Sequence, residues 1–226
     1  MKEIKDRILY EDNHLIVINK RAGEIVQGDK TGDEPLLEKV REYIRVRYDK
    51  PGNVFCGLVH RIDRPVSGAV IFAKTSKVLT RMNTIIKERK ISKIYWAIVE
   101  NIPDKEKTTL IHYLKKNEKL NKSFAFDKEA AGTQKAILSY TMLAHSERYA
   151  LLEVELLTGR HHQIRAQLSS AGLVIKGDLK YGAKRSNVDG SISLHARKIE
   201  FEHPVSHQNV LIIAEPFDSL FKKNLN

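Results

Sequence analysis

The sequence predicts an α+β fold with a mixed, mostly antiparallel central sheet and flanking helices. Seven or more short apolar stretches have the length of strands, whereas only a few stretches have helical spacing. The two kinds of stretch do not alternate regularly, as a parallel β-α-β sheet would require. With 226 residues, 42% of them hydrophobic, we expect a single domain spanning residues 1–226 with a buried core.

The first elements are a buried strand and an amphipathic helix. Residues 15–18 form a continuous apolar run, and the turn-forming residues 19–23 end it. Apolar residues recur at helical spacing after Pro35, a residue suited to a helix's first turn, and they predict a helix over about 34–48. Residues 49–53, which include Pro and Gly, stop this helix.

A charged loop follows between two apolar stretches. Residues 54–59 lead into it, and residues 69–73 leave it as a strand. Ser76 is expected to cap a helix that continues through Lys87, because apolar residues then recur on one face. Residues 94–99 are expected to form the next strand.

The second half of the chain predicts mostly strands. Residues 117–132 are polar, rich in Lys and without clear period, so we expect a long loop or a mobile hairpin tip. A helix is predicted over about 162–170, with Gly172 as its C-terminal stop. The remaining strands are expected at residues 136–143, 150–156, 194–201 and 210–214.

The chain is strongly basic. Lys and Arg number 39 against 28 Asp and Glu, giving a formal net charge of +11. Such an excess favours a polyanionic partner, most often nucleic acid, although a merely basic surface is the alternative. The basic residues gather in three groups: Lys87, Arg89, Lys90 and Lys93; Lys115, Lys116, Lys119 and Lys122; Lys176, Lys180, Lys184 and Arg185.

Composition argues against several classes of protein. The lone Cys56 excludes an internal disulfide and a Cys-based metal cluster, and it fits a reducing cytosol. Adjacent His161 and His162 would point to different sides of an element, so we expect no metal site. The N-terminal residues resemble no signal peptide, and no apolar run approaches the ~20 residues of a membrane helix. We therefore expect a soluble, cytoplasmic monomer.

The run HRIDRPVSG at residues 60–68 is the most informative segment. It places the carboxylate of Asp63 between Arg61 and Arg64, in a stretch that Pro65 and Gly68 keep out of regular structure. Neighbouring guanidiniums favour the ionised carboxylate, which is then fit to attack an electrophile or to stabilise a cation. The alternative is a charged surface turn.

A second informative segment is LTGRHHQIR at residues 157–165. Arg160 and Arg165 flank a turn that leads into the predicted helix, and Arg165 shares a helical face with His162. One arginine is placed to reach an acid and the other to meet a phosphate. The alternative is a helix N-terminus that carries solvated basic residues.

These segments resemble the motifs of the RluA-type RNA pseudouridine synthases. Five motifs match in the family's order: residues 60–68 with 73–74 (HRLD…SG…AK), 93–97 (K-x-Y-x-A), 158–165 (TGR-x-HQIR), 177–182 (GD…YG) and 194–204 (LHA…F-x-HP). The resemblance spans nearly the whole chain, from Leu15 to Pro216. It implies the pseudouridine synthase catalytic fold and the isomerisation of a uridine in ribosomal RNA, transfer RNA or both. Because no atom enters or leaves in that reaction, no cofactor or metal is expected.

The resemblance also implies a catalytic set. Asp63 matches the family's essential aspartate, which acts covalently or as a nucleophile; attack on the base, attack on C1′ and a glycal route stay open. Tyr95 matches the tyrosine that packs on the target base and takes part in proton transfer at C5. Arg165 matches the arginine that pairs with the aspartate.

Arg61 matches the residue that fills the space of the flipped-out nucleotide, and flipping costs about a few kcal/mol. Other residues of the same motifs are expected to bind the substrate: His60, Arg160, Gln163 and Ile164.

Some features depart from the family pattern. Ile62 and Val66 replace the commoner Leu and Thr, and His161 and Gln167 stand where Thr and His are frequent. The chain begins almost at the first catalytic strand, so we expect no small N-terminal S4-like RNA-binding domain, and the catalytic domain itself would recognise RNA. A non-catalytic RNA-binding or ribosome-assembly protein on the same fold is the alternative function.

Overall fold

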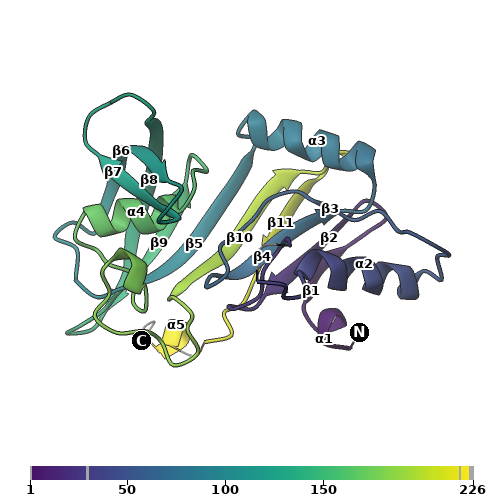
Figure 1. Ribbon diagram of the computed structural model, residues 1–226, viewed down its shortest axis with the longest axis horizontal. Coiled ribbons are helices and arrows are strands. Elements are labelled where there is room, and N and C mark those ends of the chain that lie inside the picture. Colours follow the sequence, from purple (N-terminus) through teal and green to yellow (C-terminus); the bar gives the residue numbers. More distant parts are fainter. Residues whose placement is uncertain (1, 29–30, 219, 224–226) are drawn as a thin grey trace. The chain divides into compact units, whose positions relative to one another are not determined.

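The computed structural model describes residues 2–28, 31–218 and 220–223 (Figure 1). The chain forms two compact units. Unit 1 comprises Met1–Ile91 and Ala196–Glu215. Unit 2 comprises Ser92–His195 and Pro216–Asn226. Strands with a few flanking helices make up both units, which confirms the α+β fold class.

Unit 1 is a sheet with helices packed against it. Its elements are α1 (Lys2–Lys5), β1 (Ile8–Glu11), β2 (Leu15–Lys20), α2 (Leu36–Arg47), β3 (Gly57–Leu58), β4 (Ser67–Ala73), α3 (Ser76–Lys87), most of β10 (Leu194–Glu202) and β11 (Asn209–Ile213). The strand order is β1-β2-β4-β10, with β3 also paired to β4 and β11 paired to β10. β1 was not predicted, since its four residues are all half-buried and show no clear alternation.

The core of unit 1 lies around β2 and β4. The two strands are antiparallel, with Leu15 opposite Ala73 and Lys20 opposite Gly68. All six residues of β2 are buried, so both faces of this strand are covered. On one face, Val78 and Met82 of α3 pack against the strands of the sheet.

The predicted helices of unit 1 are confirmed, with one corrected cap. α2 follows Pro35, which lies at the N-cap with extended φ and ψ. α3 begins at Ser76, but its N-cap is Thr75, so the predicted Ser76 cap was wrong. The Thr75 hydroxyl accepts a hydrogen bond of 3.3 Å from the Val78 backbone N–H. Thr75 has the extended backbone that a capping side chain needs, whereas Ser76 is already helical.

Unit 2 is built on a second set of antiparallel strands. Its elements are β5 (Ile91–Val99), β6 (Lys107–Asn117), β7 (Lys122–Phe126), β8 (Gln134–His145), β9 (Ala150–Leu156), α4 (Gln163–Ser170), the 3-10 helix η1 (Leu179–Tyr181) and α5 (Leu220–Lys223). The strand order is β5-β9-β8-β6-β7. Ala166 of α4 packs against Leu114 and Ala136, which places this helix on one face of the strands (Figure 1).

The β6–β7 hairpin occupies part of the segment that was expected to be a long loop or a mobile hairpin tip. Residues 117–132 include β7, which pairs antiparallel with β6 from Tyr113–Phe126 to Asn117–Lys122. β6 was missed as well. Both strands alternate poorly in hydrophobicity, because Lys and Phe share their exposed face. The pairing of β6 with β8 and of β7 with β6, rather than a local pattern, determines that they are strands.

Within the described ranges, no helix is long and apolar enough to span a membrane.

Candidate active site

The predicted site residues fall into both units. His60, Arg61 and Asp63 lie between β3 and β4 of unit 1. The other predicted residues belong to unit 2, on β5 and at the start of α4: Tyr95, Arg160, Gln163, Ile164 and Arg165. Each group is held by a separate set of contacts within its own unit.

The Asp63 loop is a tight turn that enters β4. The Val66 backbone N–H donates a 3.0 Å hydrogen bond to the Asp63 carbonyl. Ile62 and Val66 are buried on either side of Asp63, which is itself half-buried. The two apolar side chains anchor the turn in the core, while the carboxylate stays accessible enough to meet a substrate.

Gly68 explains why the motif needs a glycine at the start of β4. Its φ of +118° is a conformation that L side chains rarely adopt. A Cβ there would also lie 2.4 Å from the Ala196 carbonyl oxygen and 2.5 Å from its nitrogen. β4 therefore approaches the backbone at Ala196 closely, which fixes the exit of the Asp63 loop.

The side chain of Lys20 holds the Asp63 loop through a hydrogen bond to its backbone. Its side chain is fully buried at the end of β2. The ammonium donates hydrogen bonds to the carbonyls of Arg21 (2.9 Å), Glu24 (2.8 Å) and Arg64 (3.1 Å). Burial lowers the pKa of Lys20 from 10.5 to about 7, although the charges of Glu24 and Asp63 act in the opposite direction. Sequence reasoning assigned residues 19–23 only to a turn and missed this contact.

The two arginines beside Asp63 have different surroundings. The guanidinium of Arg64 forms a 2.6 Å ion pair with Asp33 on the surface. Arg61 is exposed.

The Ile71 N–H donates to His60 Nε2 at 3.3 Å, so that nitrogen accepts and the ring carries its proton on Nδ1.

Tyr95 lies in the middle of β5. It is directly opposite Val154 of β9, and its side chain is 7% exposed. Lys93, two residues earlier, is on the same face of the strand. Burial lowers the pKa of the Lys93 ammonium, and a Cβ at Gly159 would lie 3.8 Å from its Nζ. The two residues bring a phenol and an amine to one face of β5.

Arg165 forms a buried ion pair with Asp178. Its Nε and Nη2 atoms each donate a 2.7 Å hydrogen bond, one to each oxygen of the carboxylate. The two side chains are 6% and 1% exposed. The predicted GD motif contains Asp178, but sequence reasoning gave it no role, because thirteen residues separate it from Arg165 along the chain.

His162 connects Arg165 to Tyr181. It is the N-cap of α4 and has a left-handed backbone with φ of 52°. The Arg165 guanidinium only donates, so His162 Nε2 accepts from Nη1 at 3.3 Å. His162 Nδ1 then carries the proton and donates to the Tyr181 hydroxyl at 3.0 Å. That hydroxyl also accepts from the Ser123 N–H at 2.8 Å, which ties β7 to this network.

The turn before α4 is held by Gln163. Its Oε1 accepts hydrogen bonds from the Thr158 hydroxyl (2.8 Å) and the Arg160 N–H (2.9 Å). Its Nε2 donates to the Ile137 carbonyl at 3.0 Å. Gln163 and Ile164 are both buried, at 3% and 4% exposed. These contacts fix the direction in which α4 presents Arg165.

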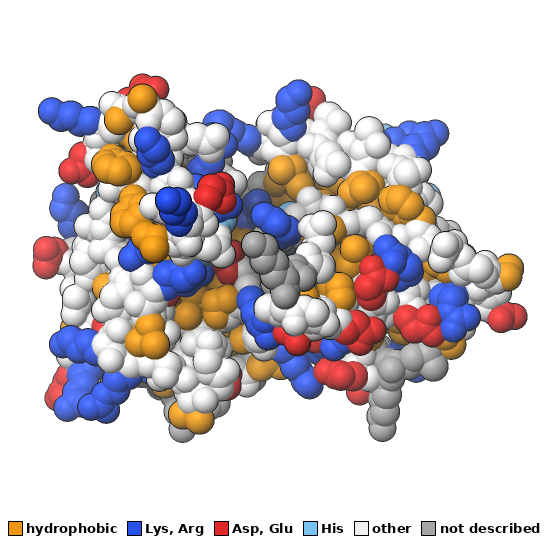
Figure 2. Space-filling view, in the orientation of Figure 1, with side chains coloured by type: hydrophobic (Ala, Val, Ile, Leu, Met, Phe, Trp, Pro, Cys, Tyr) orange, Lys and Arg blue, Asp and Glu red, His pale blue; other side chains and the backbone are white. Residues whose placement is uncertain are grey.

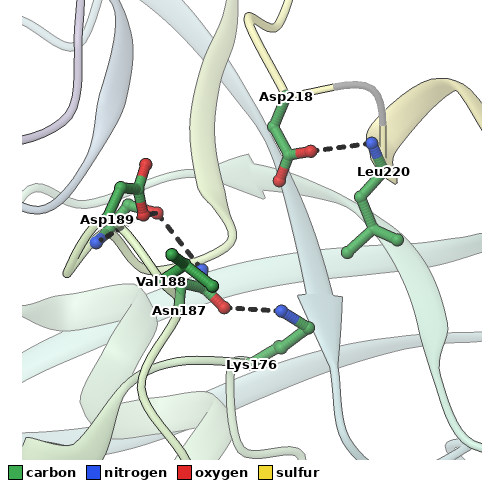
Figure 3. A pocket seen from close by; sticks show the side chains of 7 residues that line it. Lys176, Asn187, Val188, Asp189, Asp218 and Leu220 are labelled. Carbon is green, nitrogen blue, oxygen red and sulfur yellow. Dashed lines mark hydrogen bonds between the residues drawn. The ribbon is translucent and has the colours of Figure 1, made fainter.

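A hollow of about 430 Å³ lies beside the loop that follows Asp178 (Figure 3). Lys176 donates to Asn187 at 2.5 Å on one side of it, and Leu220 N–H donates to Asp218 at 2.8 Å on the other. A Cβ at Gly177 would lie 2.8 Å from Asn187 Cγ. None of the predicted site residues lines this hollow. Its lining includes Lys176 and Asn187, which precede and follow Asp178 in the chain.

No group of three or more His, Cys, Asp or Glu residues in the described part of the chain is arranged to hold a metal ion.

The chain is similar to known proteins over most of its length. The model of the RNA pseudouridylate synthase family matches residues 14–170. A ribosomal large subunit pseudouridine synthase C of Buchnera aphidicola is 33% identical over 230 residues, which cover 96% of this chain and 70% of the relative. A tRNA pseudouridine synthase C of Vibrio parahaemolyticus is 29% identical over 242 residues, which cover 97% of this chain and 94% of the relative.

The fold matches as well. The solved structure of human RNA pseudouridylate synthase domain containing 4 has a TM-score of 0.81 with 21% identity, covering 99% of this chain and 93% of that one. The chain belongs to the RNA pseudouridine synthase family, whose enzymes isomerise uridine to pseudouridine in RNA.

Proposed function

We propose that this protein converts a specific uridine of ribosomal or transfer RNA to pseudouridine, with Asp63 as the catalytic carboxylate. The observation that carries the proposal is the Asp63 turn. Lys20 and Gly68 hold the backbone around a half-buried acid in a motif that matches the family. The relatives that carry rRNA and tRNA in their names support both substrate classes.

The chemistry requires three tasks. The base must be detached from C1′, turned over and rejoined through C5, with a proton lost from C5. We assign the first task to Asp63, whether it attacks the base, attacks C1′ or assists a glycal route. Tyr95 is proposed to pack on the base and take part in proton transfer, and Arg165 to hold the aspartate ionised.

Substrate binding is proposed for residues around this set. Arg61, which is exposed, is suited to fill the space of the extruded nucleotide. Arg160 is proposed to meet a phosphate. The remaining residues of the proposed substrate-binding set are His60, Gln163 and Ile164. The burial of Gln163 and Ile164 favours an effect through the shape of the turn.

The state of the protein in the cell is part of the proposal. We expect both units to work as one catalytic domain in a monomer in the cytoplasm, where ribosomal and transfer RNA are present. Size-exclusion chromatography with light scattering tests the monomer, which a dimer mass would contradict.

The decisive experiment is Asp63→Asn. RNA isolated from cells that lack the gene, labelled with tritium at C5 of uridine, is the substrate for a tritium-release assay. We expect no release from Asp63→Asn with RNA affinity retained, and normal release from the control Asp6→Asn, whose carboxylate is exposed. Release by Asp63→Asn would contradict the assignment.

The rival function is a non-catalytic RNA-binding or ribosome-assembly protein, which the net charge of +11 favours. It predicts that Asp63→Asn fully rescues a deletion strain. Mapping pseudouridines by carbodiimide primer extension, with and without the gene, identifies the target nucleotide and separates the two functions.

A further inference from the structure

Unit 2 carries an exposed surface of aromatic and basic side chains that the proposed catalytic set does not use. We call it the aromatic-basic face. It lies on the side of β6, β7 and β8 that faces away from α4, and it consists of Tyr113, Lys115, Lys122, Phe124, Phe126 and Lys135.

The strand register brings these residues together. Phe126 is directly opposite Tyr113, and Tyr113 is directly opposite Lys135 on its other side. Phe124 is opposite Lys115. Directly opposed residues point to the same face of a sheet, so the six side chains form one continuous surface. Phe124 and Phe126, two residues apart on one strand, are about 7 Å from each other.

The two phenylalanine side chains of the aromatic-basic face are exposed rather than packed, whereas Tyr113 is half-buried. Phe124 is 39% exposed and Phe126 is 44% exposed. By contrast, Leu114 and Ala136, which point to the other face, are buried against α4. In the view of Figure 2, Lys and Arg side chains lie beside hydrophobic side chains on the surface of unit 2.

The charges around the aromatic rings are positive. Lys115 and Lys135 are exposed. Lys122 is half-buried, and its ammonium lies 5.6 Å from the centre of the Phe124 ring and 4.8 Å from the centre of the Tyr181 ring, at the edge of this face. Asp127, the next residue after β7, lies 3.8 Å from His112, which is on the opposite face.

Two carboxylates mark the boundary of the aromatic-basic face. Glu155 and Glu153 point to the same side from β9, opposite Ser139 and Thr141, beyond β8. An anionic ligand is thereby confined to the strands that carry the lysines.

This face is distinct from the side of the sheet that carries Tyr95. Tyr95 is opposite Val154, which is opposite Tyr140 on β8. Tyr140 and Lys135 are five residues apart on one strand, so they point to opposite faces. Arg160 connects the two regions, since its Nε donates to the Lys135 carbonyl at 3.2 Å.

We propose that the aromatic-basic face binds an unpaired segment of the RNA substrate, with bases stacked on Phe124 and Phe126 and phosphates on Lys115 and Lys135. Exposed aromatic rings interleaved with lysines are the arrangement by which sheets bind single-stranded RNA. The inference rests on the proposed function, because it assumes that RNA is the substrate. It adds that nucleotides outside the target site contribute to affinity.

The test compares RNA binding by variants of the full chain. The probes are a fluorescent 20-nucleotide oligouridine and a perfect duplex of the same length, measured by anisotropy. We expect the wild type to prefer the single strand. F124A/F126A should lose at least about 5-fold in affinity for the oligouridine for each stacked base.

Three further variants separate stacking from other contacts. F124L/F126L keeps apolar side chains but no ring, and we expect it to bind as weakly as F124A/F126A, whereas F124W/F126W should bind at least as well as the wild type. K115A/K135A should reduce the salt slope by about 0.7 for each lysine, because each phosphate contact on a single strand releases counterions. The phenylalanine variants should leave the slope unchanged.

The matched control is L211A/I213A, which truncates another exposed pair two residues apart on a strand, at 52% and 49% exposed. It should bind like the wild type. Wild-type affinity in F124A/F126A would overturn the inference. Full binding by F124L/F126L would overturn it too, since the face would then be a general apolar surface suited to a protein.

Failure of the proposed function gives a different result. If the wild type releases no tritium from any RNA, the proposed function is at fault. If the wild type releases tritium and binds oligouridine, but the phenylalanine variants are unchanged in affinity, only the aromatic-basic face is disproved.

Discussion

Arg165 and Asp178 form a two-pronged ion pair, with both hydrogen bonds at 2.7 Å and both side chains almost completely buried. The pair fixes the plane of the guanidinium, because two parallel contacts leave it little rotational freedom. Nη1 still extends to His162. The arginine that we propose to hold the catalytic aspartate ionised is thus oriented by an acid from another part of the same unit.

Asp178→Asn should destabilise the protein by about 3–5 kcal/mol, because it leaves a buried guanidinium without its counter-charge. It should also lower the rate of pseudouridine formation. Urea unfolding and tritium release measure the two effects. Asp104→Asn, at an exposed carboxylate, is the control and should change stability by less than about 0.5 kcal/mol. Equal stability of the two variants would contradict this role.

Lys20 should make the free energy of unfolding rise with pH. Its pKa is about 7 in the folded chain, against 10.5 in the unfolded one. Between these values the unfolded chain binds more protons, so stability increases by up to about 1.4 kcal/mol per pH unit. Urea unfolding at pH 7, 8 and 9 should show a smaller rise for Lys20→Met than for the wild type. Equal slopes would exclude Lys20 as the source.

Gly68→Ala should lower the free energy of unfolding by about 2–4 kcal/mol, because it combines backbone strain with a steric clash against Ala196. Gly190→Ala is a matched control: its φ is +71°, but nothing lies within 4 Å of its Cβ. It should cost only about 1–2 kcal/mol. Thermal unfolding measures both. If the two variants were equally destabilised, the close approach of β4 to Ala196 would carry no energetic weight.

RNA affinity should fall steeply as salt rises. The excess of 11 positive charges predicts several phosphate contacts, each of which releases counterions. A plot of log K against log [KCl] from anisotropy titrations with oligouridine should be linear, with a slope of about −0.7 for each phosphate bound. A slope near zero would contradict the inference that the positive charges contact RNA phosphates.

Local patterns predicted most of the fold. The apolar run of β2 and the helical spacing of α2 and α3 are properties of consecutive residues, so they can be read without a partner. The β6–β7 hairpin could not be predicted in that way. Its exposed face carries both Lys and Phe, and β6 is a strand because it pairs with β7 on one side and with β8 on the other.

The candidate site also contains residues that the sequence predicted and residues that only the structure identified. The motifs around Asp63, Tyr95 and Arg165 were visible because they are short and ordered along the chain. The residues that hold these motifs in place could not be identified from the sequence. Lys20 acts 44 residues away from Arg64 in sequence, and Asp178 and Tyr181 reach α4 through folding alone.

The sequence by itself determined the α+β class and the basic charge, since these follow from composition and local patterns, and its motifs gave the candidate reactive residues through their resemblance to a family. Tertiary structure alone decided which groups are buried together: Lys20 beneath the Asp63 loop, Asp178 against Arg165, and the phenylalanines of β7 beside the lysines of β6 and β8. The physical reason is that a buried charge or an exposed ring acquires its role from partners that packing brings to it, and those partners are distant in the chain.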